Sequence, residues 1–331
     1  MAHSPRTIRI AAASFVALLM IAGSLAFSGP DPLFGLGRIA EAQSSEELLK
    51  EYAAKDTDTD GLPDWQEALY GTDPTEAESF RAGILDGEAV AQGLVQPKVA
   101  VRAPGEPADI DSIPGTVAAP DSLTDRFSQT LLSQYLLGRG ETPPSSEEIA
   151  SFVETGVENL RDESASPDRF SPKDIRTSSE TGSAALIRYA AEVESAFQSN
   201  SVSEGKSELT YFSEAMKGDA AALAEIKQLS DAYADIANAL MGISVPAEAA
   251  QAHLAIANAL AHLGETSADM AAMETDPVRA LMGISLYGGY AEDLIAGFLN
   301  LHGVFAARQI SIPEGAPGFN TMQSAINATK Q

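Results

Sequence analysis

The sequence predicts an all-α protein in four parts: an N-terminal transmembrane helix, a small helix–loop–helix module, a proline-rich linker and a C-terminal helical bundle. Three observations support this prediction. Apolar residues fill most of the stretch 10–27, an acidic loop lies near residue 60, and apolar residues recur at every third or fourth position after residue 121. Because no segment alternates apolar and polar residues convincingly, we expect little β-structure.

The N-terminal segment, residues 1–29, indicates the compartment. Arg6 and Arg9 precede an uncharged, mostly apolar run whose length is near the lower limit for a helix that crosses a bilayer. Since basic residues stay in the cytoplasm, we expect a single-pass anchor with the C-terminal part outside the cytoplasm. The alternative is a signal peptide cleaved at 24–26 or 40–42, which would release a secreted protein.

Residues 56–67 fill every position of the calcium-loop pattern Asp-x-Asp-x-Asp-Gly-x5-Glu. Calcium binds about six to eight oxygen atoms, and such a loop supplies them from positions 1, 3, 5, 7, 9 and 12. Those positions are Asp56, Asp58, Asp60, Leu62 (through its backbone carbonyl), Asp64 (directly or through water) and Glu67. The alternative is a solvated acidic turn, but five carboxylates this close repel one another unless a cation lies between them. The spacing therefore predicts a Ca²⁺ site.

The eight residues from Glu67 to Pro74 read Glu-Ala-Leu-Tyr-Gly-Thr-Asp-Pro. Together with the loop they resemble the bacterial thrombospondin type 3-like repeat, an EF-hand-like calcium-binding module of surface and envelope proteins. The resemblance covers residues 44–75 and implies the ligand role for the six residues named above. Such repeats usually occur in tandem, whereas this chain repeats the loop nowhere nearby, so a solitary site is expected.

Helices are expected on both sides of the loop. Ser44 and Glu47 form a capping box for the entering helix, and the exit helix should span 64–70 and stop at Gly71. Trp65, the one tryptophan of the chain, is expected to pack this module rather than recognise a ligand.

The segment after the module leads into a spacer. Residues 75–94 predict one further helix, although Gly83 and Gly87 weaken it. Residues 96–120 contain five prolines among Gly, Ala and Asp without an apolar period, which predicts an extended linker.

The C-terminal domain, residues 121–331, is expected to be α-helical. One long helix is predicted around Leu223 to Leu240, and Pro246 should begin another that places His253 on its apolar stripe as a buried, hydrogen-bonded histidine. The fragments 235–244 and 276–285 are similar. They indicate either duplicated helical hairpins or a coincidence between alanine-rich helices.

Composition narrows the classes of function. The net charge of −26 disfavours nucleic acid as a partner, and the absence of cysteine excludes disulfides and thiol chemistry. No nucleophile elbow, phosphate-binding loop or zinc-protease motif appears, so we do not expect an enzyme.

The function that the sequence favours is calcium binding at the cell envelope by a membrane-anchored protein whose helical domain binds or scaffolds an envelope protein or the cell wall. One alternative is a ligand-binding sensor that acts through a membrane partner. Another is a cell-wall-acting enzyme whose carboxylates converge only in the folded chain. The sequence does not specify the partner or the oligomeric state.

Overall fold

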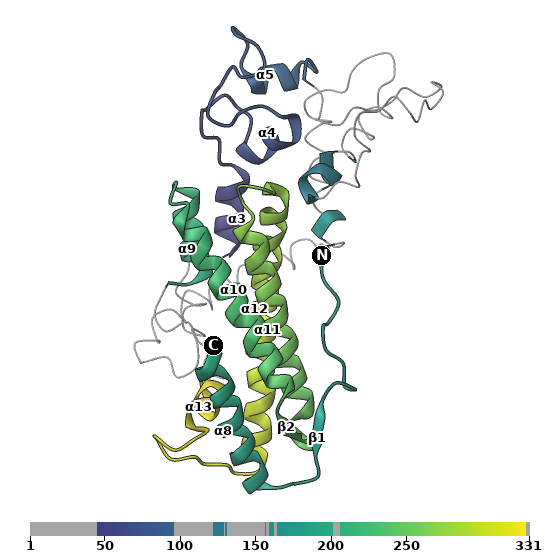
Figure 1. The fold of residues 1–331 in the computed structure, drawn as a ribbon, viewed down its shortest axis with the longest axis vertical. Helices are drawn as coiled ribbons and strands as arrows, with labels where there is room; N and C mark the ends of the chain where they lie inside the picture. The colour runs from purple at the N-terminus through teal and green to yellow at the C-terminus, as the bar shows by residue number, and fades with distance from the viewer. Residues whose placement is uncertain are drawn as a thin grey trace, which may run out of the picture. The chain divides into compact units, whose positions relative to one another are not determined.

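The computed structural model of the protein describes residues 45–95, 122–128, 164–200 and 206–328, and single positions at 130, 156 and 159–161. The chain forms two compact units. One holds Pro167–Ala268 and Tyr287–Gln331, and the other holds Glu46–Ser166 and Asp269–Leu286. The described chain is mostly helical, as predicted (Figure 1).

The first unit, which we call the helical unit, is built from six helices and two short strands among its described residues. In chain order these are β1 (Arg176–Ser178), α8 (Ser183–Asn200), α9 (Glu208–Met216), α10 (Ala221–Met241), β2 (Ser244–Pro246), α11 (Ala250–Ala271), α12 (Pro277–Ala307) and α13 (Phe319–Ala328). A single 3₁₀ turn, Ala247–Ala249, precedes α11.

Close helix packing in this unit depends on small residues. Gly264 of α11 lies so near α10 that a Cβ there would stand 3.1 Å from the Ser230 carbonyl oxygen. Gly297 of α12 lies equally near α11, where a Cβ would stand 2.8 Å from a side-chain carbon of Ile256. Glycine at these two positions lets the backbones approach, and the larger side chains beside them fill the core.

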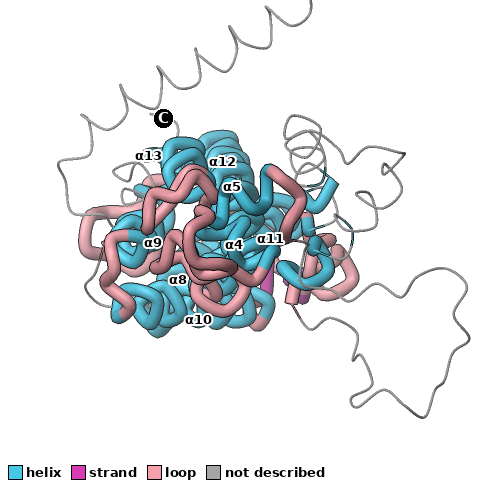
Figure 2. Tube along the Cα trace, turned by 90° about the horizontal axis from the view of Figure 1, so that it is seen from above, coloured by secondary structure: helices cyan, strands magenta, loops and turns pink. Residues whose placement is uncertain are grey.

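The predicted long helix is confirmed as α10, and Pro246 precedes the turn that starts α11. His253 is buried and its Nδ1 lies 3.1 Å from the Tyr189 hydroxyl, as expected of a hydrogen-bonded core histidine. The two short parallel strands, drawn in magenta in Figure 2, were not predicted. They pair Arg176 with Ser244 through Ser178 with Pro246, and three residues are too few to show alternation.

The interpretation of 235–244 and 276–285 as duplicated hairpins is wrong. The first fragment ends α10 and enters β2, whereas Asp276 immediately precedes α12 and the rest of the second fragment lies inside that helix. The two similar fragments therefore occupy different structural positions, and their similarity is a coincidence.

The second unit, which we call the loop unit, contains α3 (Ser45–Ala53), α4 (Asp64–Tyr70), α5 (Asp86–Ala91) and helical residues 123–128. It also includes the end of α11 and the beginning of α12. Its apolar core combines residues far apart in the sequence: Leu62, Trp65, Leu69, Tyr70, Ala89, Val90, Val95, Phe127 and Val278.

Asp276 links the start of α12 to the helical residues 123–128 through hydrogen bonds. Its carboxylate accepts hydrogen bonds from the Leu123 N–H at 2.7 Å, the Thr124 N–H at 2.9 Å and the Thr124 hydroxyl at 2.6 Å. The Tyr52 hydroxyl of α3 donates to the Pro277 carbonyl at 3.2 Å. The loop unit therefore contains residues from both sides of the domain boundary that the sequence predicted at residue 121.

The helix predicted over 75–94 is much shorter than expected. Only α5 forms, because Gly83 adopts a φ of 89° and Asp86 accepts hydrogen bonds from Ser79 N–H at 3.0 Å and Phe80 N–H at 2.8 Å. These bonds satisfy backbone groups outside a helix, so the turn before α5 competes successfully with helix formation.

Several predicted features lie outside the described residues. These are the anchor or signal peptide at 1–29, Ser44 of the capping box and the linker at 96–120. Among the helices that the structure describes, none combines the length and hydropathy that crossing a bilayer requires.

Candidate metal centre

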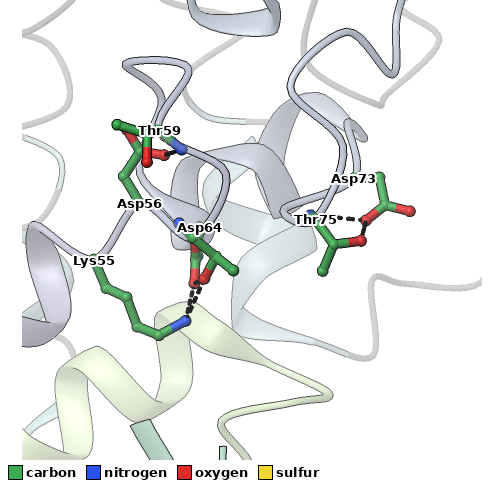
Figure 3. Close-up of polar contacts among 7 residues, drawn as sticks. Lys55, Asp56, Thr59, Asp64, Asp73 and Thr75 are labelled. Carbon is green, nitrogen blue, oxygen red and sulfur yellow. Dashed lines mark hydrogen bonds and ion pairs between the residues drawn. The ribbon is translucent and has the colours of Figure 1, made fainter. Parts of the chain in front are cut away.

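The acidic loop joins α3 to α4, and its first aspartate organises the backbone. The Asp56 carboxylate accepts the Thr59 N–H at 2.8 Å (Figure 3). It also accepts the Gly61 N–H at 3.0 Å. Thr59 has a φ of 65° and Gly61 a φ of 95°, both in the left-handed region. The chain therefore turns back on itself where the calcium-loop pattern requires glycine.

This turn brings three of the predicted ligands together. Oxygen atoms of Asp56, Asp58 and Asp60 lie within 4.8 Å of one another. Within the described part of the chain, no other group of three His, Asp or Glu side chains meets this distance. The arrangement can hold a metal ion, because hard cations bind clustered carboxylate oxygens.

Asp60 is the buried member of this triad, and it links the loop to the next helix. Its carboxylate accepts the Leu62 N–H at 2.7 Å and the Gly87 N–H of α5 at 2.9 Å. Gly87 lies so close that a Cβ there would stand 2.7 Å from the Asp60 carbonyl oxygen. The acidic loop and α5 are thus one packed structure.

Glu67, at position 12 of the loop, is completely buried on α4. One of its carboxylate oxygens, Oε1, accepts a long hydrogen bond of 3.3 Å from the Thr72 hydroxyl, and Oε2 has no hydrogen-bond partner. Burial, followed by the negative charge of Asp58, raises the pKa of Glu67 to about 8. A buried carboxylate with so few donors is costly unless it is protonated or meets a cation.

Asp58 shows the same deficit. Its Oδ2 is buried without a partner, and burial together with Asp60 raises the pKa of its carboxyl above the ordinary value. One unsatisfied oxygen thus belongs to the close triad and the other to the buried Glu67, and a cation could accept both as ligands. The residues present therefore fit a bound metal.

Asp64, predicted at position 9, is directed elsewhere. Its carboxylate forms an ion pair with Lys55 (Figure 3). It also accepts hydrogen bonds from the Thr57 N–H at 2.7 Å and the Thr57 hydroxyl at 2.8 Å. Asp64 is not part of the close triad. The predicted ligand set is thus only partly assembled: three carboxylates meet, Glu67 is buried nearby, and Asp64 binds Lys55.

The side chains of Leu62 and Trp65 pack in the apolar core of the loop unit. The Leu62 side chain is buried in the apolar cluster, and its carbonyl stays the predicted ligand at position 7. Trp65 is buried, donates from Nε1 to the Ala53 carbonyl at 3.0 Å and lies 6.5 Å from the Phe127 ring. The prediction that Trp65 packs the module is confirmed.

Three residues of the site escaped the sequence pattern. Lys55 precedes the loop directly, so its charge was visible but not its partner. Thr57 occupies a position where the pattern accepts any residue, and Gly87 lies 27 residues after Asp60, with nothing in the sequence to connect them.

The helical unit has polar groups of its own. His262 stacks on Tyr290 at 4.3 Å, and its Nε2 lies 3.3 Å from Asp168. A hollow of about 390 Å³ is lined by α8 and the segment 315–320, including Glu194. The Glu194 carboxylate accepts four hydrogen bonds, so it acts structurally there.

Comparison of the chain with protein-family models, with characterised proteins and with solved structures gives no match in any of the three.

Proposed function

We propose that residues 44–75 bind one calcium ion, and that the protein is a membrane-anchored, extracytoplasmic calcium-binding protein whose helical part binds or scaffolds an envelope partner. The observation that supports calcium binding best is the close triad beside a fully buried Glu67 with an unpartnered oxygen. A bound cation would satisfy both features at once.

Calcium fits the donor set better than other common ions. The ligands are carboxylate and carbonyl oxygens, which disfavours zinc and copper, because these ions prefer nitrogen or sulfur. Magnesium keeps several waters in a strict octahedron and does not need a protein cage of this size. Calcium accepts both oxygens of a glutamate at position 12, and Glu67 occupies that position. The resemblance to thrombospondin type 3-like repeats supports the same ion.

The role of calcium would be structural. Asp60 already joins the loop to α5 through Gly87, and Glu67 lies on α4 next to the apolar core. An ion held by both would fix the loop against two helices. Ordering of the loop unit, rather than chemistry at the ion, is the expected consequence.

The proposed compartment suits this ion. Two arginines before the apolar run favour export of the rest of the chain, and extracellular calcium modules work with dissociation constants of about 0.1–1 mM. Protease added to cells stripped of any outer barrier should degrade the C-terminal part. Complete protection would contradict the proposed topology.

The test of the calcium site is calorimetric titration of the purified full-length chain, with Trp65 fluorescence as a second signal. We expect millimolar or tighter calcium binding, weakened about a hundredfold by Glu67→Gln because two ligand oxygens and a charge are affected. Asp73→Asn is the matched control, since Asp73 lies outside the loop and accepts hydrogen bonds from Thr75 instead (Figure 3). No binding at millimolar calcium, or equal binding by Glu67→Gln, would overturn the proposal.

A further inference from the structure

Lys55 and Asp64 are brought together by more than their charges. The Asp64 N–H donates to the Lys55 carbonyl at 2.8 Å, so the backbone holds the two residues side by side. The Lys55 ammonium then forms the ion pair with Asp64 and donates to the Thr57 hydroxyl at 2.6 Å. The contact is therefore built into the fold of the loop.

With this contact, both oxygens of Asp64 accept hydrogen bonds. Its Oδ1 accepts from the Thr57 N–H, and its Oδ2 accepts from the Thr57 hydroxyl and from Lys55. The oxygens of Asp58 and Glu67, by contrast, include one each without a partner. The Lys55 ammonium thus pairs with Asp64 at position 9, whereas one oxygen each of Asp58 at position 3 and Glu67 at position 12 has no hydrogen-bond partner.

The structure assigns Lys55 as an internal competitor for calcium: its ammonium occupies the position 9 carboxylate and thereby lowers the affinity of the loop. The inference rests on the calcium site proposed above and identifies the residue that sets its affinity. The Asp64 carboxylate already accepts three hydrogen bonds, and an ammonium on it repels a second cation at the same oxygens. Direct ligation of calcium by Asp64 therefore competes with the Lys55 contact.

Lys55 has a second effect in the metal-free loop. Five carboxylates lie within residues 56–67, and one ammonium among them reduces their mutual repulsion. The loop can therefore keep its turn without an ion, at the cost of a weaker site.

The experiment is a double-mutant cycle on the full-length chain, with calcium affinity measured calorimetrically for the wild type, Lys55→Met, Asp64→Asn and the double variant. Methionine keeps the apolar stem of Lys55 and removes the charge. We expect Lys55→Met to bind calcium about fivefold more tightly, as the loss of one partly exposed ion pair predicts. Asp64→Asn should weaken binding more in the Lys55→Met background than in the wild type, because only a released Asp64 can contribute to the ion.

Lys50→Met is the matched control, because Lys50 is exposed on α3 and its loss changes the net charge equally. Its effect should be smaller and should vanish at high salt, whereas the effect of Lys55→Met should persist. Circular dichroism and Trp65 fluorescence verify folding, and Lys55→Gln replaces Lys55→Met if the latter fails to fold. Wild-type binding without a gain in the Lys55 variant, or an equal gain in Lys50→Met, overturns the Lys55 assignment alone. Absence of calcium binding by the wild type overturns both proposals.

Discussion

Two of the buried glutamates, Glu194 in the helical unit and Glu67 in the loop unit, differ in how many hydrogen bonds their carboxylates accept. Glu194 of the helical unit accepts hydrogen bonds from Gly318 N–H at 2.5 Å, Asn320 Nδ2 at 2.8 Å, Gln198 Nε2 at 3.0 Å and Asn320 N–H at 3.4 Å. Glu67 of the loop unit accepts one bond of 3.3 Å and has one oxygen without a partner. A carboxylate satisfied by its own chain belongs to the framework, whereas a buried and unsatisfied one indicates a site for a cation.

The largest expected effect is the loss of stability of the helical unit when Glu194 is replaced. Glu194→Gln removes a charge-assisted acceptor and turns one oxygen into a competing donor, so it should cost about 3 kcal/mol of unfolding free energy. Far-UV circular dichroism during denaturation measures this loss. Calcium titration followed by Trp65 should stay unchanged, and a change there would show that Glu194 also affects the site.

Glu67→Gln should act with the opposite sign when calcium is absent. The folded-state pKa of Glu67, about 8, lies above its ordinary value of 4.5. Neutral Glu67 therefore contributes fully to the free energy of unfolding below pH 4.5, and this contribution is lost as pH rises toward 8. An uncharged glutamine should therefore stabilise the metal-free loop unit by about 2 kcal/mol at pH 8. Denaturation followed by Trp65 fluorescence in chelator measures this. Destabilisation under these conditions would mean that the Glu67 charge is satisfied in the free protein.

The helical unit should respond to pH in the reverse direction through His253. Burial lowers the pKa of His253 from 6.5 to about 4. Neutral His253 therefore contributes to the free energy of unfolding above pH 6.5, and this contribution is lost as pH falls toward 4. Between pH 7 and pH 5 His253 should contribute a loss of about 2 kcal/mol of unfolding free energy, because its side chain binds the proton more readily in the unfolded chain. His253→Gln should flatten this part of the pH profile. An unchanged profile in His253→Gln would assign the acid sensitivity to other groups.

The smallest expected effect concerns the junction of the acidic loop with α5. Gly87→Ala places a Cβ 2.7 Å from the Asp60 carbonyl oxygen, so it should cost about 1 kcal/mol of loop-unit stability and weaken calcium binding severalfold. Gly289→Ala is the control, because Gly289 lies within α12 with no atom inside 4 Å of an added Cβ. That variant should be neutral or slightly stabilising. If Gly87→Ala binds calcium like the wild type, α5 is not coupled to the site.

Prediction from sequence succeeded where neighbours along the chain decide the structure. The exit helix spans Asp64–Tyr70 as expected, and Gly71 ends it with a φ of 79°. Prediction failed over 75–94, where Asp86 satisfies backbone groups of a turn, and for the strands, which are three residues long. In these cases the deciding partner lies outside the window that a periodic pattern covers.

The sequence by itself determined the helical class, the turn at Gly61 and the clustering of Asp56, Asp58 and Asp60, because each follows from residues a few positions apart. Only the tertiary structure decided that Asp64 binds Lys55, that Asp60 holds Gly87, and that Asp276 and Val278 join the loop unit. The physical reason is that each of these contacts needs a partner that only folding brings within reach. A sequence shows which residues can ligate an ion, and only the packed chain shows which of them are already occupied.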